Sequence, residues 1–303
     1  MTALRRIQFP AGVRFDDYTD YQGNYMNYRT GWLIPNTEVW SGGDLMVRIN
    51  SLGCKGPELT PGVPVIGVFG DSTTFCAGPD AWASHTRVPG YQTLNCGIEG
   101  HDLTRLCERY QQLQPSVDFA AVIVAGSWHN LVYNRTDEDF WTASLDTVDD
   151  DQPVAVCTLA TALVPACRER GLDDAIKAVY ANNLRFASWG NWPTTPEKTR
   201  DLYDGMMRYN DFVRAYCERR GRILIDLYEA WRPASYEQMG DQFMDPAHHR
   251  TSLYPDLGRI AAAALAPHLI GRDDLSAGAA LPLLPMPTSA DDDALHRNIY
   301  PLW

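Results

Sequence analysis

An acid and a hydroxyl stand side by side at the end of the first apolar run of the chain. The run, at 63–69 (VPVIGVF), is followed directly by Gly70, Asp71 and Ser72. Its length and the small residues after it favour a buried strand that ends in a tight turn. In open parallel α/β sheets, ligands bind at the carboxyl ends of the strands. Ser72 is therefore either an ordinary turn residue or a nucleophile, and the rest of the chain has to decide.

A second polar group lies near the other end of the chain, in the stretch QFMDPAHHR. Asp245 precedes His248 there by three positions, in a loop that contains a proline. A histidine that acts as a general base needs its Nδ1–H oriented by a carboxylate, with its Nε2 facing the nucleophile. An aspartate nearby in a bent loop can orient it, although the same spacing also occurs in solvated loops. The adjacent His249 is a second candidate base, but no carboxylate precedes it at this spacing.

Alternating apolar and amphipathic segments must position these groups. Strand character recurs in five runs, and helical spacing in three longer ones. The strands are expected at 63–69, 91–97, 119–126, 153–160 and 222–228, and the helices at 103–113, 199–221 and 256–270. Strands that alternate with helices predict βαβ units with right-handed crossovers. The sequence therefore predicts an α/β fold, a three-layer α/β/α sandwich around a mostly parallel five-stranded sheet.

The chain divides into three expected parts. Residues 1–60 are rich in Tyr, Trp, Asn and Gly, and we expect an N-terminal extension that packs on a catalytic domain at 61–272. Within that domain, 161–198 is longer than a normal connection and is expected to be an insertion or a lid. Residues 273–303 are rich in Pro and Ala and are predicted to form a C-terminal arm, which hints at a homodimer.

The bulk composition argues against several classes of protein. The 303 residues are 45% hydrophobic and 21% charged, as in an ordinary globular protein. A net charge of −12 is unfavourable for binding nucleic acid or an anionic membrane. There is no apolar stretch near the ~18 residues of a spanning helix, and no secretory signal. Seven cysteines without C-x-x-C spacing support neither a zinc site nor a disulfide framework, so we expect a cytoplasmic protein without metal or cofactor.

The combination of these motifs resembles the SGNH hydrolases, also called the GDSL family, over roughly residues 48–270. Gly-Asp-Ser closes the first strand, and Asp-x-x-His precedes the last helix. The stretch LNCGIEGHD (94–102) is similar to the second block of the family, whose last glycine, here Gly100, donates a backbone N–H. The stretch RINSLGCKGPE (48–58) is similar to the lead-in R-x-N-S-x-G-x-R-G-x-E of members with an N-terminal extension.

The third block departs from the family pattern. Members usually have Gly-x-Asn-Asp after the third strand, with the asparagine as an oxyanion donor, whereas this chain has VAGSWHNLV at 124–132. Alignment on Gly126 places Trp128 at the asparagine position, and a shift by one residue places His129 there. A local bulge would instead bring Asn130 into the oxyanion hole, the set of N–H donors that binds the developing negative charge. We favour Asn130, because a carboxamide is a donor at any pH whereas a neutral histidine depends on its tautomer.

The resemblance implies a serine-dependent esterase that acts on a small-molecule acyl substrate. Ser72 would be the nucleophile, His248 the base and Asp245 the group that orients it. The backbone N–H groups of Ser72 and Gly100, with Asn130 or His129, would bind the oxyanion, and Asp71 would hold the serine turn in shape. An acyltransferase that passes the acyl group to a hydroxyl or an amine would use the same site. A binding protein whose site has decayed is the third alternative.

Overall fold

The computed structural model describes residues 4–9, 25–27, 29–41, 43–76, 80–161, 171–182, 195–231, 247–249 and 251–270. Asp245 lies outside these residues, as does the predicted C-terminal arm at 273–303. The predicted insertion at 161–198 is described only in part. The division of the chain into domains therefore stays a prediction.

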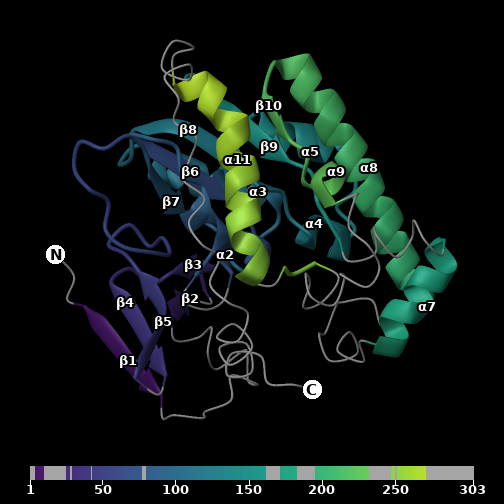
Figure 1. Ribbon diagram of the computed structural model, residues 1–303, viewed down its shortest axis with the longest axis horizontal. Coiled ribbons are helices and arrows are strands. Elements are labelled where there is room, and N and C mark those ends of the chain that lie inside the picture. Colours follow the sequence, from purple (N-terminus) through teal and green to yellow (C-terminus); the bar gives the residue numbers. More distant parts are fainter. Residues whose placement is uncertain are drawn as a thin grey trace.

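The centre of the molecule is a five-stranded sheet whose strands all run parallel (Figure 1). The strands are β6 (Val65–Phe69), β7 (Gln92–Asn95), β8 (Phe119–Val124), β9 (Val154–Cys157) and β10 (Ile223–Ile225), in the order β10-β9-β8-β6-β7. Every residue of β6 is buried, as its continuous apolar run predicts. The strand order reverses at β6, and in open α/β sheets ligands bind at the carboxyl ends of the strands next to such a reversal.

Helices cover both faces of this sheet. Those outside the N-terminal part are α2 (Ser72–Phe75), α3 (Leu103–Leu113), α4 (His129–Val132), α5 (Glu138–Leu145), α7 (Leu172–Asn182), α8 (Pro196–Arg220), α9 (Leu227–Trp231) and α11 (Tyr254–Leu269), with 3₁₀ turns η1 (Trp82–His85) and η3 (Thr251–Leu253). α3 contacts α5 and α5 contacts α8 on one face, while α11 packs with η1 on the other. Figure 1 shows α11 crossing in front of the strands. The predicted three-layer α/β/α sandwich is confirmed.

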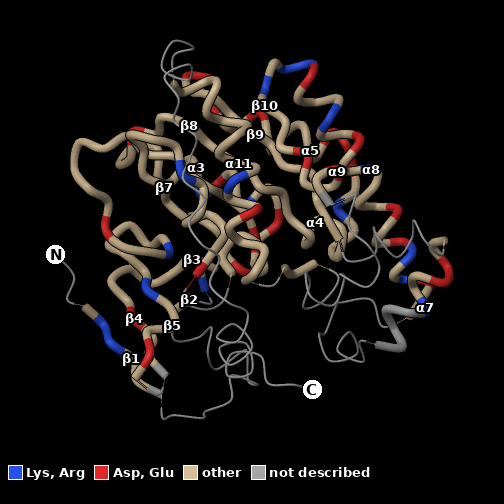
Figure 2. Tube along the Cα trace, in the orientation of Figure 1, with Lys and Arg blue, Asp and Glu red and all other residues tan. Residues whose placement is uncertain are grey.

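The long helix α8 shows why local signals place its ends. Thr195 caps it by accepting a hydrogen bond from the Lys198 backbone, and Pro196 occupies the first turn. Gly221 ends it with φ 65°, a left-handed conformation that glycine adopts without strain. The expected helix began at 199 because its apolar spacing begins there, whereas the cap lies earlier. Both acidic and basic residues occur along the whole length of α8 (Figure 2).

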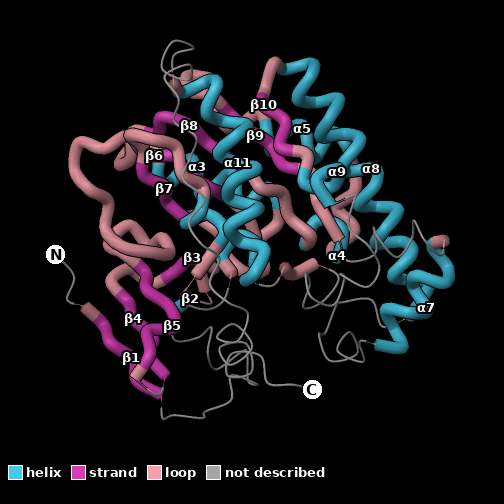
Figure 3. Tube along the Cα trace, in the orientation of Figure 1, coloured by secondary structure: helices cyan, strands magenta, loops and turns pink. Residues whose placement is uncertain are grey.

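The N-terminal part forms a separate small sheet beside the central one (Figure 3). Its strands are β1 (Arg5–Phe9), β4 (Thr37–Ser41) and β5 (Asp44–Ile49), and β2 (Met26–Asn27) pairs with β3 (Trp32–Leu33) in a two-stranded hairpin. Tyr25, Val39 and Ile49 form an apolar cluster that also contains Phe75 and Ile98. The N-terminal strands therefore pack against the loops that leave β6 and β7.

The described part of the predicted insertion contains helix α7, which packs against α8. Residues 162–170 and 183–194 of the same insertion lie outside the described residues. None of the described helices is both long and apolar enough to cross a membrane.

Candidate active site

The chain turns sharply where β6 ends, and this turn presents Ser72. Asp71 caps the one-turn helix α2 by accepting a hydrogen bond from the Thr73 backbone, and Ser72 is the first helical residue. Gly70 is required because a Cβ there would lie 2.0 Å from Thr74 Oγ1. Ser72 is only 8% exposed. Its hydroxyl therefore lies at the carboxyl end of a central strand, largely shielded from solvent.

The structure brings Ser72 and His248 together across 176 residues of sequence. Ser72 Oγ lies 2.8 Å from His248 Nε2, and both side chains are buried. This distance is that of a nucleophile and a general base in hydrogen-bond contact. His249 is buried to the same degree, but it is His248 that contacts the serine. Asp245, the predicted third member, falls outside the described residues and remains a prediction.

Asp71 is completely buried behind the serine turn. Its Oδ1 accepts hydrogen bonds from the Thr73 backbone at 2.9 Å and the Thr73 hydroxyl at 2.8 Å. Its Oδ2 accepts one from the Trp128 backbone at 2.8 Å and lies 3.4 Å from His129 Nδ1. Burial alone raises the pKa of Asp71, but the hydrogen bonds from His129 and Thr73 outweigh burial and hold the pKa below its usual value. Asp71 thus joins the serine turn to the loop that follows β8.

We expect Asp71→Asn to lower the free energy of unfolding by about 3 kcal/mol, because an amide replaces the buried charge that its donors require. Urea unfolding at pH 7 measures this. Because the folded pKa lies below the unfolded value of about 3.9, the advantage of the wild type is complete above that pH. It is lost as the pH falls through the folded pKa. Asp118→Asn, an exposed change of the same charge, should change stability little; equal losses in the two variants contradict this role.

The loop that follows β7 runs beside the serine turn. The Cys96 backbone donates to Val68 O, and the Ile98 backbone donates to Gly70 O at 2.9 Å. A Cβ on Gly97 would lie 2.5 Å from the Phe75 backbone nitrogen, so only glycine permits this approach. Gly100 follows at the exposed end of the loop with φ 78°. The loop that carries the predicted second donor therefore borders the turn that carries Ser72.

The three residues that the altered third block leaves open make different hydrogen bonds. Trp128 uses its backbone N–H on Asp71, and His129 directs Nδ1 to the same carboxylate. Asn130 is fully buried, and its Oδ1 accepts a hydrogen bond from the Leu103 backbone at 2.9 Å. Its Nδ2 has no partner among the described residues. A buried donor without a partner is costly, so the unpaired Nδ2 of Asn130 is compatible with its predicted role as an oxyanion donor, which stays a prediction.

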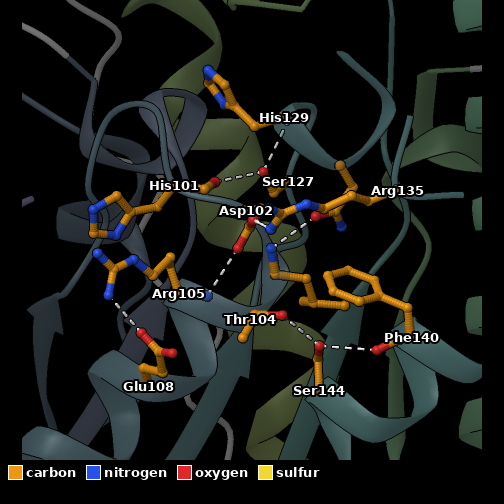
Figure 4. Close-up of polar contacts among 12 residues, drawn as sticks. His101, Asp102, Thr104, Arg105, Glu108, Ser127, His129, Arg135, Phe140 and Ser144 are labelled. Atoms are coloured by element: carbon orange, nitrogen blue, oxygen red, sulfur yellow. Dashed lines mark hydrogen bonds and ion pairs between the residues drawn. The ribbon is translucent and has the colours of Figure 1, made fainter. Parts of the chain in front are cut away.

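Further side chains join the loops after β7 and β8 (Figure 4). Ser127 Oγ donates to His101 O at 2.6 Å and accepts from the His129 backbone at 3.0 Å. Arg135 forms an ion pair with Asp102, the capping residue of α3, and its backbone donates to Asn130 O at 2.7 Å. These contacts fix the position of Asn130 relative to Gly100. Sequence reasoning missed Arg135 because no local pattern links it to Asp102.

His101 follows Gly100 but faces the N-terminal hairpin. Its ring meets the edge of Trp32, with 5.2 Å between ring centroids. Burial lowers the pKa of His101 to about 4, although a hydrogen bond to the Gly31 backbone opposes this effect. The imidazole is therefore neutral at pH 7 and serves in packing beside the site.

Comparison with solved structures finds proteins of similar arrangement. One is a member of the lipolytic protein G-D-S-L family from Veillonella parvula, with 11% identity over 66% of this chain and 95% of that chain and a TM-score of 0.44. Another is a catalytic mutant of an acetylxylan esterase from Geobacillus stearothermophilus, with 14% identity over 70% and 96% and a TM-score of 0.46. A third is the catalytic domain of a peptidoglycan O-acetyltransferase from Streptococcus pneumoniae, with 13% identity over 70% and 94% and a TM-score of 0.43.

The sequence matches no protein-family model and no curated protein. The fold is instead established by the topology of the chain itself, with five parallel strands in the order β10-β9-β8-β6-β7 and helices on both faces. The chain therefore has the fold that its resemblance to the SGNH hydrolases implies.

Proposed function

We propose that this chain is a serine-dependent acyl hydrolase of the SGNH type that cleaves an ester bond of a small-molecule substrate. The observation that carries the proposal is the 2.8 Å contact between Ser72 Oγ and His248 Nε2 at the carboxyl end of the central sheet. Two buried side chains from distant parts of the chain meet there in the geometry of a nucleophile and its base.

The first half of the reaction forms the acyl-enzyme. Ser72 Oγ attacks the carbonyl carbon of the ester, while His248 Nε2 accepts the hydroxyl proton. The carbonyl electron pair moves to oxygen and forms a tetrahedral oxyanion. The backbone N–H groups of Ser72 and Gly100, with Asn130 Nδ2, donate hydrogen bonds to it. The intermediate then collapses, the bond to the leaving oxygen breaks, and His248 gives its proton to the departing alcohol.

The second half releases the acid. A water molecule attacks the acyl carbon and gives a proton to His248, so that a second oxyanion forms in the same hole. Its collapse breaks the bond to Ser72 Oγ and returns the proton to that oxygen. Serine and histidine thus end in their starting states. The low exposure of both side chains favours this chemistry, because hydrogen bonds to developing charge are stronger away from water.

An acyltransferase is the second candidate, and a cavity lined by the two residues that follow Asn130 in the sequence is a candidate place for its acceptor. The cavity of about 480 Å³ lies between α4 and α8, and Leu131 and Val132, directly after Asn130, form part of its lining. Arg208 and Asp204 on α8 add polar groups to the same lining. If an acceptor bound in this cavity reached the acyl-enzyme at Ser72, its hydroxyl or amine would replace water in the second half of the reaction.

A fluorophosphonate probe and a simple ester test the proposal and separate the two candidates. We expect the folded wild type to react covalently with the probe and to release free acetate from p-nitrophenyl acetate. Formation of an acetyl ester with an added alcohol, in preference to free acetate, would instead favour the transferase. A folded wild type that neither reacts with the probe nor consumes the ester contradicts both candidates and favours a decayed site.

We expect Asn130→Ala to lower kcat by about 10²–10³-fold with little change in KM, because it removes a donor used only in the transition state. The same assay on His129→Ala tests the alternative. If Asn130 completes the oxyanion hole, the histidine variant loses much less activity. Thermal unfolding of both variants is the control, since Asn130 also accepts a hydrogen bond from Leu103. A larger loss of kcat in His129→Ala would assign the donor to His129.

A further inference from the structure

A lysine from the N-terminal part is buried beside the serine helix. Lys55, in the loop between β5 and β6, is only 6% exposed. Its Nζ donates to Phe75 O at 2.9 Å, to Asp80 O at 2.7 Å and to Cys76 O. An ammonium group has three N–H donors, and here all three meet backbone carbonyls. A charged side chain is costly to bury, so such complete pairing indicates a specific role.

The carbonyls that Lys55 binds belong to the end of α2 and the segment after it. Because α2 has only four residues, the last of which is Phe75, it holds few internal hydrogen bonds of its own. The chain then leaves the helix through Cys76, whose φ of 52° is uncommon for a residue other than glycine. Such a conformation persists only when its surroundings enforce it. Lys55 binds the carbonyl of Cys76, and Cys76 also donates through its backbone to Ser72 O and through Sγ to Thr73 O.

The loop that carries Lys55 is itself tightly held. Asn50 Oδ1 accepts from the backbones of Leu52 and Cys54, both at 3.0 Å, and Asn50 Nδ2 donates to Pro57 O at 3.1 Å. Glu58 accepts from both the backbone and the hydroxyl of Ser51. Asn50, Ser51 and Glu58 all belong to the RINSLGCKGPE motif, whose Arg48 instead pairs with Glu38 on β4. The side-chain hydrogen bonds of these three residues stay within the loop, so they support Lys55.

Two neighbours fix this support against the central sheet. The Lys55 backbone donates to Asn95 O, at the end of β7, at 3.0 Å. Arg109 on α3 donates through Nη2 to the carbonyls of Leu52 and Gly53, both at 2.8 Å. Asn95 in turn donates through Nδ2 to Thr74 O, within α2. The lysine loop, the end of β7 and the serine helix therefore form one hydrogen-bonded unit.

We propose that Lys55 is a positioning residue for the nucleophile, because its hydrogen bonds to the carbonyls of Phe75, Cys76 and Asp80 hold the one-turn helix that begins at Ser72. This inference rests on the proposed function. It makes the N-terminal part a component of the catalytic machinery that acts through α2, without contact to the substrate.

Replacement of Lys55 tests the inference by its effect on kcat. Lys55→Met keeps the length of the side chain and removes the donors, and we expect a loss of about 10²-fold in kcat with KM within about twofold, because a small misplacement of a nucleophile has an effect of this size. Lys55→Arg keeps a cationic donor group, and we expect it to recover at least tenfold of that loss. Lys177→Met removes an exposed lysine on α7 and is the matched control. Circular dichroism and thermal unfolding check that each variant is folded.

The pH profile of the wild type is a second test that needs no variant. Burial lowers the pKa of Lys55 to about 8, although Cys76, Asp80 and Glu99 oppose this, and the Phe75 ring lies 5.2 Å from Nζ. Above that pH the neutral amine has only two N–H donors for three carbonyls. We therefore expect kcat to fall as the pH rises through about 8. In Lys55→Arg the fall should move to higher pH, since a guanidinium stays charged.

The outcomes separate this inference from the proposed function. An active wild type with an equally active Lys55→Met variant overturns the role of Lys55 and leaves the proposed function intact. A Lys55→Met variant whose KM rises while its kcat stays unchanged also overturns the role of Lys55, because positioning of the nucleophile acts on kcat. If neither variant folds, the pH profile of the wild type decides. A kcat that stays constant through pH 8–9 overturns the role of Lys55. A kcat that falls over this range while KM stays unchanged supports it. A folded wild type without any esterase activity refutes the proposed function, and the role of Lys55 with it.

Discussion

Replacing Ser72 with alanine is expected to lower kcat for p-nitrophenyl acetate by roughly four to six orders of magnitude. The expected loss is this large because the hydroxyl forms the covalent bond to the substrate, and it lies 2.8 Å from its proposed base, His248 Nε2. Background hydrolysis by the oxyanion donors alone would remain. Initial rates under substrate saturation, together with covalent reaction with a fluorophosphonate, measure the effect.

The matched control is Ser116→Ala, which removes an exposed hydroxyl after α3. This variant should keep wild-type rates and wild-type reaction with the probe. The buried position of Ser72 makes a check of folding necessary, although serine to alanine removes only one oxygen atom. A Ser72→Ala protein that still hydrolyses the ester at a tenth of the wild-type rate would show that the reaction occurs elsewhere.

Replacing His248 with alanine has the second largest expected effect, a loss of about 10⁴-fold or more in kcat. Without the imidazole, Ser72 has no base to accept its proton, and the leaving group has no acid to supply one. The neighbouring His249 provides a close comparison, because its exposed fraction is 8% and that of His248 is 7%. His249→Ala should lose at most about tenfold, through packing alone.

The comparison of the two histidine variants decides the identity of the base. A much larger loss in His248→Ala, with both proteins folded by circular dichroism, supports His248. Similar modest losses in the two variants would mean that neither imidazole is essential. A larger loss in His249→Ala would transfer the role of base to that residue and would make the contact of His248 with Ser72 a structural one.

Several parts of the fold were predictable because their signals are local. Helix α3 spans the predicted residues 103–113, since its apolar spacing, its Asp102 cap and its polar face lie within a few turns. Likewise the continuous apolar run before Gly70 marks β6 as a strand buried on both faces. Both signals depend only on neighbouring residues, so the sequence contains them in full.

The N-terminal strands were not predictable in the same way. β1 pairs in parallel with β4, with Arg5 opposite Thr37 and Phe9 opposite Ser41. Residues 10–36 separate β1 from β4, so no local signal links these two strands. Such pairing depends on tertiary packing more than on intrinsic strand preference. The aromatic residues of this part become informative only in the folded chain, where Tyr25 stacks on Phe75 with ring centroids 5.5 Å apart.

In the third block, the sequence alone does not determine which residue is the oxyanion donor. Trp128, His129 and Asn130 are consecutive, so no spacing rule decides which of them faces the oxyanion. In the folded chain, Asp71 binds the Trp128 backbone and His129 Nδ1, and the Leu103 backbone binds the Asn130 amide, so the three residues differ in the groups that they leave unpaired. These partners come from two other loops. Their positions follow from the order of the strands.

By itself, the sequence determined the approximate positions of the five central strands and of helices α3, α8 and α11, that the serine turn ends a buried strand, and that a histidine lies in a polar stretch before the last helix. Only the tertiary structure decided that Ser72 and His248 meet, and that Lys55 reaches the carbonyls behind them. The physical reason is the separation in sequence over which each kind of interaction acts. Apolar period and turn chemistry act over a few residues, whereas contacts between distant segments depend on how crossovers and side-chain packing place whole elements in space.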